Sequence, residues 1–421
     1  MASPLRILVL CHYWAPEVGA PQRRWQWLAQ GLVERGHELA VLTPAPHYPV
    51  GVLLDDAAWL APGAARRDAA GALVHRTAFR PYDAGLGGRG LDQAVAAVDA
   101  LRIGLARFRG GMRPDVIIGS VPGLPTLPVA LALGAALHCP VVAELRDAWP
   151  DILDSASQWS GATVQGGGAG LSAPLSAAAR RVTSVVVSAW QRRASAVVTT
   201  TDSFAAVLGQ RGVGRVVTIR NTAAAVAPVP PVQVDRADSR LRVLYLGTVG
   251  RAQGLVSAVR AARLAQDAGT PILLRVVGEG AELAAVQAEA ERLAAPVEVL
   301  PPVPASQVAA HYTWADSVLV SLQDWPAMGL TVPSKLYEVL GVGRHVSGAV
   351  AGEAAQVISD SGGGSVVPPQ DPAALAALWS VLARDRSRLR VLGAGRWLAA
   401  HASPEVMVSR YEALLQEVAR G

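Results

Sequence analysis

The sequence is almost without lysine, because Lys335 is the single lysine among 38 lysine and arginine residues. In a chain that uses arginine almost everywhere, this lysine is either a chance survivor or a functional residue. Charged residues make up only 17% of the chain and hydrophobic residues 51%, a composition that excludes extensive disorder and allows a large core. With 421 residues, the chain is long enough for two domains.

Long apolar runs are also missing. No stretch of 18 or more uncharged apolar residues occurs, so no membrane-spanning helix is predicted. Met1–Trp14 has one arginine, then an apolar stretch, and no small-residue cleavage site in the right place. It is therefore predicted to be the first core strand and not a signal peptide.

Cysteine is scarce, and the net charge is modest. Cys11 and Cys139 lie far apart at the ends of apolar stretches and are predicted to be buried and reduced, which favours the cytoplasm. The net charge is +5, but no basic run interleaves with aromatic residues, which argues against nucleic acid as a partner. Phosphorylated small molecules or anionic lipid at the inner face of the plasma membrane fit this charge better.

Short strands and helices alternate in the order expected for parallel sheets. Leu5–Cys11 is a continuous apolar run, as a fully buried strand requires, and Gln22–Arg35 has apolar residues at helical spacing. Glu38–Leu42 is predicted to be the next strand. The pattern continues with strands at 115–120, 140–144, 196–201 and 216–220 and a helix at 125–137.

A second series begins after residues 223–240, which are rich in alanine, proline and valine and are predicted to be a linker. Its strands are expected at 242–246, 272–277, 297–300 and 317–321, and its helices at 254–268 and 282–293. The sequence therefore predicts an α/β protein with two doubly wound, Rossmann-like parallel-sheet domains, residues 1–225 and 240–400, facing each other across a cleft. Residues 83–90 and 155–172 are predicted to be flexible, as filler or as a lid over a bound acceptor.

Two loops between a strand and the following helix offer amides or cations to a phosphate-bearing ligand. In the first domain, the small residues Gly19 and Ala20 let a phosphate approach the amides at the helix start. In the second domain, Arg251 is the natural cation of the loop Leu246–Gly254. A solvated loop arginine is the alternative interpretation.

The most specific group lies in the segment Thr331–Glu338. Pro333 and Ser334 are predicted to start a helix with Ser334 as its cap. Lys335 then lies in the first turn, where the helix dipole disfavours a cation, so its ammonium is predicted to meet an anion. Glu338 is on the same face and is predicted to accept hydrogen bonds from ribose hydroxyls. A simple Lys–Glu surface pair is the alternative.

Other candidates follow predicted strands directly. Gly278 and Glu279 end one strand of the second domain, and Leu300 is predicted to offer backbone groups to a nucleotide base. In the first domain, Arg146 and Asp147 follow the strand that ends at Glu144. Charges at such a strand end usually face the ligand, although a structural ion pair would explain them too.

These motifs resemble those of the retaining GT-B glycosyltransferases of family 4, and more narrowly the group that includes colanic-acid and O-antigen fucosamine transferases. The resemblance covers nearly the whole chain. The matching segments are Tyr13–Glu17, Gly19–Pro21, Arg35–Glu38, Glu144–Pro150, Gly247–Gly254, Val277–Gly280, Pro333–Glu338 and Val367–Pro372.

The resemblance implies a GT-B fold and a hexosyl- or N-acetylhexosaminyltransferase that retains the anomeric configuration. The implied donor is a nucleotide sugar, with a UDP-sugar preferred, and the implied acceptor is a saccharide or lipid-linked saccharide of cell-surface polysaccharide assembly. No metal or other cofactor is implied, because side chains and helix ends neutralise the diphosphate. The last helix, within residues 401–421, is implied to return to the first domain.

Some family positions are changed. Leu330 stands where the family often has the first of two glutamates, and Thr248 and Gln253 replace a common arginine and lysine, which leaves Arg251 as their substitute. Arg146 replaces the common catalytic-loop histidine. The predicted catalytic residues are therefore Arg146, Asp147 as an orienting or proton-accepting carboxylate, and Lys335.

Two other functions stay open, a non-catalytic sugar-nucleotide-binding protein and a GT-B nucleotide-sugar epimerase. Membrane contact is a further hypothesis, because the segment Ala178–Arg193 carries four arginines beside Val182, Val185, Val186 and Trp190. A helix that packs on its own sheet is the alternative for that segment.

Overall fold

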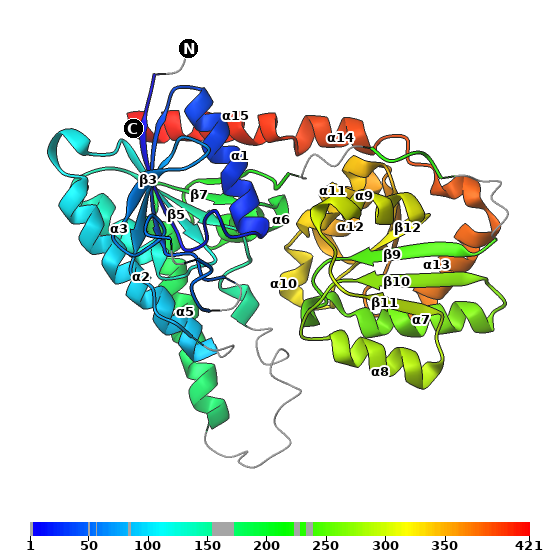
Figure 1. Ribbon diagram of the computed structural model, residues 1–421. Helices are drawn as coiled ribbons and strands as arrows, with labels where there is room; N and C mark the ends of the chain where they lie inside the picture. Colours follow the sequence, from blue (N-terminus) through cyan, green and yellow to red (C-terminus); the bar gives the residue numbers. More distant parts are fainter. Residues whose placement is uncertain are drawn as a thin grey trace. The chain divides into compact units, whose positions relative to one another are not determined.

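The computed structural model describes residues 3–48, 51–55, 57–82, 86–153, 172–222, 228–232 and 239–421. The chain divides into two compact units (Figure 1). Unit 1 contains Met1–Asp154, Val164–Asn221 and Pro404–Gly421, and unit 2 contains Ser155–Thr163 and Thr222–Ser403. Each unit is built around a sheet of its own.

The sheet of unit 1 has eight strands in the order β3-β4-β2-β1-β5-β6-β7-β8. All neighbouring strands are parallel except β3, which pairs antiparallel with β4 at the edge. The central strands are buried along almost their whole length, as sheets covered on both faces require. The strands are β1 (Arg6–Cys11), β2 (Glu38–Pro44), β3 (Ala65–Arg67), β4 (Leu73–Thr77), β5 (Val116–Val121), β6 (Val141–Leu145), β7 (Ala196–Thr199) and β8 (Val216–Thr218).

Helices cover both faces of this sheet (Figure 1). The final helix, α15 (Pro404–Arg420), packs against α1 (Ala20–Glu34), and Trp25 meets Tyr411 between them with ring centroids 6.0 Å apart. The end of the chain thus belongs to the core of unit 1. The other helices are α2 (Leu86–Arg107), α3 (Thr126–Leu137), α5 (Ser172–Arg193) and α6 (Asp202–Gln210), with short 3-10 turns η1 (Gly110–Met112) and η2 (Asp151–Leu153).

The sheet of unit 2 has six parallel strands in the order β11-β10-β9-β12-β13-β14. The strands are β9 (Leu241–Leu246), β10 (Ile272–Val277), β11 (Val297–Leu300), β12 (Ser317–Ser321), β13 (His345–Ala349) and β14 (Gly364–Val367). The helices are α7 (Leu255–Asp267), α8 (Leu283–Leu293), α9 (Ala305–Trp314), α10 (Pro326–Gly329), α11 (Ser334–Val342), α12 (Gly352–Asp360), α13 (Pro372–Arg384) and α14 (Ala394–His401), with 3-10 turns η3 (Arg251–Gln253) and η4 (Arg386–Leu389).

The two parallel sheets confirm the predicted fold class, and the predicted strands agree with the observed ones to within two residues at each end. The predicted flexible stretch at 83–90 is wrong for residues 86–90, which form the start of α2. Residues 83–85 lie outside the described part of the chain, as do residues 155–171 and most of the predicted linker.

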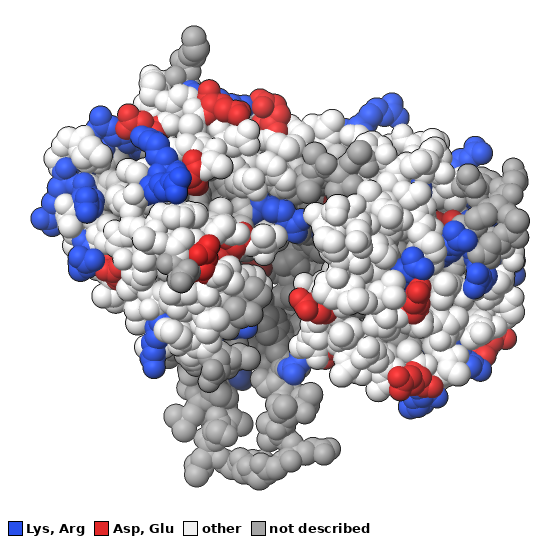
Figure 2. Space-filling model, in the orientation of Figure 1, with Lys and Arg blue, Asp and Glu red and all other residues white. Residues whose placement is uncertain are grey.

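The composition suggested a mixed surface charge, buried reduced cysteines and no membrane-spanning helix. Figure 2 shows acidic and basic side chains together on this face of each unit. Both Cys11 and Cys139 are buried and form no disulfide bond. Within the described ranges, no helix combines the length and the hydropathy that crossing a bilayer requires.

Candidate functional site

Two loops at the carboxyl ends of neighbouring strands in unit 2 are joined by backbone hydrogen bonds. The amide of Gly247, just after β9, donates to Val277 O at 2.9 Å, and Val249 N donates to Glu279 O at 2.8 Å. The amide of Gly278 donates to Leu300 O at 3.1 Å. These bonds hold the ends of β9, β10 and β11 together at the edge where parallel sheets bind their ligands.

Glycine is required for this contact between the loops. Gly278 has φ of 149°, and a β-carbon there would lie 1.9 Å from Gly247 O. Gly280 has φ of 154°, and a β-carbon there would lie 2.3 Å from Val249 O. Gly278 is therefore explained by backbone packing. Between these glycines Glu279 is exposed, and the carbonyl of Leu300 accepts the Gly278 amide.

Lys335 reaches the same edge from α11. It is the second residue of the helix and is half-buried. A β-carbon on Gly247 would lie 2.9 Å from Nζ of Lys335 and 2.7 Å from its Cε, so the ammonium lies over the loop that follows β9. The only lysine of the chain is thus placed where the glycine-lined loops end.

The predicted cap of this helix is wrong. Pro333 is the N-cap residue of α11 and makes no side-chain capping bond, while Ser334 is the first helical residue. Proline supplies the extended backbone before the helix, with ψ of 134°, but it has no oxygen side chain to bind the first amides. The amino end of α11 is therefore not capped by a side chain, although Leu336 N does donate to Pro333 O at 2.9 Å.

Glu338 lies one turn after Lys335 and has a buried partner. The hydroxyl of Tyr312, a fully buried residue of α9, donates to Oε1 of Glu338 at 2.6 Å. This bond fixes the orientation of a carboxylate that is itself only partly buried. The Tyr312 hydroxyl thus binds Oε1, one of the two carboxylate oxygens of Glu338.

Arg251 lies in the 3-10 turn η3, beyond the loop of β9. Its Nε is 3.7 Å from Oε1 of Glu282, and the side chain is about one-third exposed, at 36%. The turn is held by Gln253, whose Oε1 accepts the amide of Gly250 at 3.1 Å. Gln253, which replaces a basic residue of the family, thus has a structural role here.

Gly19 is the N-cap residue of α1 and makes no side-chain cap. Its φ of −180° is ordinary extended backbone, so the conformation does not demand glycine. A β-carbon there would lie 2.5 Å from Oε1 of Gln22. Nε2 of the same side chain donates to Oε2 of Glu17, and moving the side chain away would break this bond.

Glu144, the last residue of the predicted strand, has a structural role. It is fully buried, and its Oε1 is 3.0 Å from Nε of Arg24. Ser120 Oγ donates to its Oε2 at 2.7 Å, and the Tyr411 hydroxyl donates to Oε1 at 3.3 Å. Burial alone would raise the pKa of Glu144, but Arg24 and Arg146 hold it below its ordinary value.

Arg146 and Asp147 follow β6 and are partly exposed at the carboxyl edge of the sheet of unit 1. Nε and Nη1 of Arg146 are buried and, among the described residues, have no hydrogen-bond acceptor. Burial lowers the pKa of Arg146, and Glu144 opposes this. Burial also raises the pKa of Asp147, which Arg146 opposes. The pair thus offers a guanidinium with unused donors beside a carboxylate that holds its proton more tightly than usual.

Sequence reasoning missed a buried polar group beside this edge. His12 follows β1 directly, His47 lies three residues after β2, and both imidazoles contact Asp92 of α2. The positions of the two histidines after strand ends were a usable signal. Asp92 gave none, because α2 was not predicted.

The comparisons with known proteins agree with this architecture. A glycosyl transferase 4-like domain matches residues 19–222, and a domain of the glycosyl transferases group 1 matches residues 240–385. No curated protein sequence matches the chain.

Solved glycosyltransferase structures share the fold over almost the whole chain. Sucrose-phosphate synthase from Thermosynechococcus elongatus superposes with a TM-score of 0.73 at 16% identity, over 98% of this chain and 99% of that one. HepE from Anabaena, in complex with UDP-glucose, gives a TM-score of 0.66 at 15% identity, over 98% and 100% of the two chains. The lipopolysaccharide outer core galactosyltransferase WaaB gives 0.62 at 12% identity, over 98% and 100%.

At these identities the superpositions establish the fold, and they confirm GT-B as the fold class. The first matched domain includes every strand of the unit 1 sheet except β1, and the second includes all six strands of the unit 2 sheet. The chain therefore belongs to the GT-B glycosyltransferases, with a glycosyl transferase 4-like domain followed by a domain of the glycosyl transferases group 1.

Proposed function

We propose that the chain transfers a hexosyl or N-acetylhexosaminyl group, with retention, from a UDP-sugar to a saccharide acceptor, and needs no divalent ion at the donor diphosphate. The observation that carries this proposal is the ammonium of Lys335 over Gly247, at the carboxyl end of β9. A cation on the first turn of a helix is placed against the helix dipole, and a bound diphosphate would compensate it.

In this proposal Lys335 stabilises the leaving diphosphate. Negative charge grows on the diphosphate as the bond to the anomeric carbon breaks, and a fixed cation favours that charge more than the ground state. The amide dipoles at the start of α11 act in the same direction. Arg251 supplies the second cation when its guanidinium turns from Glu282, a change that the 3.7 Å contact makes inexpensive.

The nucleoside is assigned to the neighbouring groups. Glu338 binds ribose hydroxyls with the carboxylate that the Tyr312 hydroxyl orients. Gly278 lets the loops after β9 and β10 approach each other, and Glu279 and Leu300 border the place assigned to the base. The solved structure of HepE with UDP-glucose supports the choice of a UDP-sugar.

Arg146 and Asp147 are assigned to the acceptor and to the reacting sugar. The unused donors of the Arg146 guanidinium suit an anionic or hydroxyl-rich ligand. The raised pKa of Asp147 brings this carboxyl closer to the pH at which it can exchange a proton with an acceptor hydroxyl. Gly19, at the start of α1, is assigned to a phosphate that approaches the first amides of this helix.

A lipid-linked acceptor at an anionic membrane surface completes the proposal. Val182, Val185 and Val186 of α5 are exposed, with Val182 and Val185 at 63% and 66%. Arg181 and Arg192 are exposed on the same helix. An apolar stripe beside arginines is the surface that binds anionic membranes. Likeness to WaaB, a lipopolysaccharide outer core galactosyltransferase, supports a role in polysaccharide assembly. The cytoplasmic face of the membrane is the proposed location, and the fucosamine transferase group is the proposed subgroup.

The test is donor hydrolysis by the purified chain with UDP-, GDP- and dTDP-sugars in the presence of EDTA. We expect one UDP-sugar to be hydrolysed, and the first sugar product seen by proton NMR to keep the anomeric configuration of the donor. An inverted product, or hydrolysis that needs added Mg²⁺, would contradict the proposal.

The same assay separates the alternative functions. Leu330 in place of the family glutamate is the observation that favours a non-catalytic sugar-nucleotide-binding protein. Such a protein binds the donor and releases no sugar from it. A nucleotide-sugar epimerase converts the donor into its epimer without any acceptor, which the same NMR spectra detect.

A further inference from the structure

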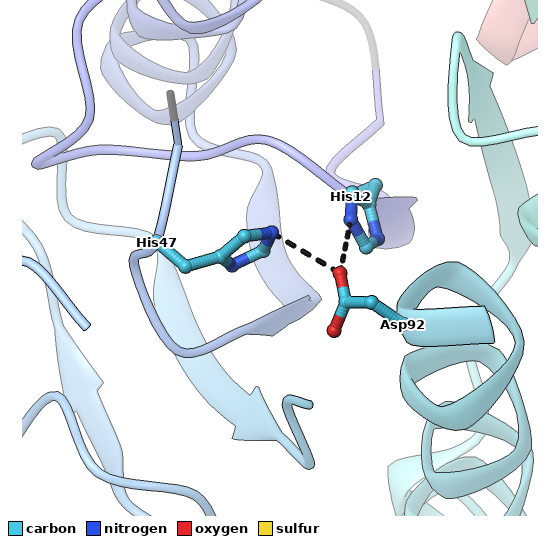
Figure 3. A group of neighbouring side chains, drawn as sticks. All are labelled: His12, His47 and Asp92. Atoms are coloured by element: carbon cyan, nitrogen blue, oxygen red, sulfur yellow. Dashed lines mark ion pairs between the residues drawn. The ribbon is translucent and has the colours of Figure 1, made fainter. Parts of the chain in front are cut away.

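Three buried side chains in unit 1 converge on one point (Figure 3). Nε2 of His12 lies 3.1 Å from Oδ2 of Asp92, and Nε2 of His47 lies 3.2 Å from the same oxygen. The three ligand atoms are within 4.8 Å of one another, and the residues are 3%, 0% and 0% exposed. We propose that His12, His47 and Asp92 bind a divalent transition-metal ion such as Zn²⁺.

The position of the proton on the His47 ring favours a metal ion at Nε2. Its Nδ1 lies 2.8 Å from the carbonyl oxygen of Ala45, and a carbonyl oxygen only accepts, so Nδ1 carries the proton. The neutral ring then has a lone pair on Nε2, which faces the carboxylate of Asp92 at 3.2 Å. Two lone pairs at that distance repel each other, so Nε2 must carry either a second proton or a metal ion.

Both contacts at Asp92 have the distance of an ion pair, but the one with His47 does not have the geometry of a hydrogen bond. Nε2 of His47 and Oδ2 of Asp92 are both buried, and neither has a hydrogen-bond partner among the described residues. An unsatisfied buried carboxylate oxygen is expensive. One cation bound by His12, His47 and Asp92 would satisfy all three atoms at once.

The distances suit such an ion. Zinc bonds to histidine nitrogen and carboxylate oxygen are about 2.0–2.2 Å, which separates ligand atoms by about 3.3 Å in a tetrahedral site. The two nitrogen–oxygen distances of 3.1 and 3.2 Å are close to this value, and all three atoms lie within 4.8 Å of one another, so a bound ion would have to draw the two nitrogens together. Two imidazoles with one carboxylate also favour Zn²⁺ and its neighbours in the first transition series over Mg²⁺ or Ca²⁺.

The surroundings fix the ligands in the way metal sites require. The Ala45 carbonyl orients the ring of His47, and Oδ1 of Asp92 accepts the amide of Arg80 at 2.9 Å. The carboxylate of Glu17 accepts the amides of His47 and Tyr48 at 2.8 and 2.9 Å, which fixes the loop that carries His47. Bound metal would tie the loops after β1 and β2 to helix α2.

The test is zinc binding by the full chain after it has been stripped with a chelator and the chelator removed. Inductively coupled plasma mass spectrometry after equilibrium dialysis should give one Zn²⁺ per chain. Added Co²⁺ should give the visible absorption of a nitrogen- and oxygen-ligated site. His47→Asn keeps a donor near the Ala45 carbonyl and removes the ligand atom, so its zinc affinity should fall at least about 100-fold.

The control is His75→Asn, because His75 is another buried histidine of unit 1. This variant should bind zinc as the unchanged protein does. Asp92→Asn is the second variant, because it keeps the acceptor for Arg80 and should also lose zinc. No zinc uptake by the stripped protein would overturn the proposal, as would equal affinity in His47→Asn or a doubly protonated His47 in zinc-treated protein by nitrogen NMR. Zinc uptake is read independently of donor binding, so its failure leaves the proposed transferase function standing.

Discussion

Nζ of Lys335 lies 2.9 Å from the position that a β-carbon on Gly247 would occupy. The pair joins α11 to the end of β9, two elements that are far apart in the sequence. Because Gly247 has no side chain, the end of the Lys335 side chain can pack directly against its backbone. A methyl group there would displace the flexible end of Lys335 without touching backbone.

Gly247→Ala should therefore weaken binding of the donor. We expect the dissociation constant of UDP to rise about 10- to 150-fold, because a charge-assisted hydrogen bond contributes roughly 1.5–3 kcal/mol. Gly247 has φ of 142°, so the backbone is strained as well. Gly269→Ala is the control, because Gly269 also has a positive φ, 77°, and nothing lies near its added methyl group. Equal loss of UDP affinity in both variants would show that strain, and not displacement of Lys335, is the cause.

The buried pair of Arg24 and Glu144 should be costly to break. Arg24→Met leaves Glu144 buried without its cation, and we expect the free energy of unfolding to fall by about 3–5 kcal/mol. Arg24 also donates to Ile219 O and Arg220 O, so the two losses reinforce each other. Chemical denaturation measures the change.

The control for this pair is the exposed ion pair of Arg102 with Asp99, whose arginine side chain is 70% exposed. Arg102→Ala should cost less than about 1 kcal/mol. A loss in Arg24→Met as small as in Arg102→Ala would mean that Glu144 is not held as a buried carboxylate.

His345 should make unit 2 less stable in acid. Burial lowers its pKa from 6.5 to about 4, with Ser317 Oγ 2.9 Å from Nδ1. The unfolded chain therefore takes up a proton between pH 6.5 and 4 that the folded chain refuses. Stability should fall through this window by about 3 kcal/mol in total and stay level below it.

The measurement compares the unchanged protein with His345→Gln by chemical denaturation at pH 7 and pH 5. The difference between the two proteins should shrink by about 2 kcal/mol at the lower pH. His401→Gln, which changes an exposed histidine of α14, should show no such change. A pH-independent difference in His345→Gln would refute the lowered pKa.

The exposed valines of α5 should bind anionic membranes. Val185→Asp is expected to weaken binding to phosphatidylglycerol vesicles about tenfold, since burying one valine contributes roughly 1.5 kcal/mol. Val381→Asp, at a 38% exposed valine of α13, should have no effect. Vesicle co-sedimentation measures both, and equal binding by the two variants would exclude α5 as the membrane surface.

Elements were predictable from the sequence where one local signal decides them. The continuous apolar run of β1 and the helical spacing of α1 each lie within one segment, and both were found. Lys335 was placed in the first turn of a helix for the same local reason.

Partners across the fold were not predictable. The partner of Glu144 was not predicted because Arg24 lies 120 residues away, and only the fold brings the two together. Asp92 was missed with the helix that carries it, and Tyr312 gave no sign that its hydroxyl orients Glu338. Such pairs depend on topology, which the local pattern does not contain.

The central claim is that Lys335 and the amide dipoles around it hold a diphosphate without a divalent ion. Isothermal titration calorimetry of UDP in EDTA, on the unchanged protein and on Lys335→Ala, tests it most directly, with Arg388→Ala as a control at an exposed arginine. We expect UDP to bind the unchanged protein and Arg388→Ala in EDTA, and to bind Lys335→Ala at least about tenfold more weakly. Binding that requires added Mg²⁺, or undiminished binding by Lys335→Ala, would contradict the claim.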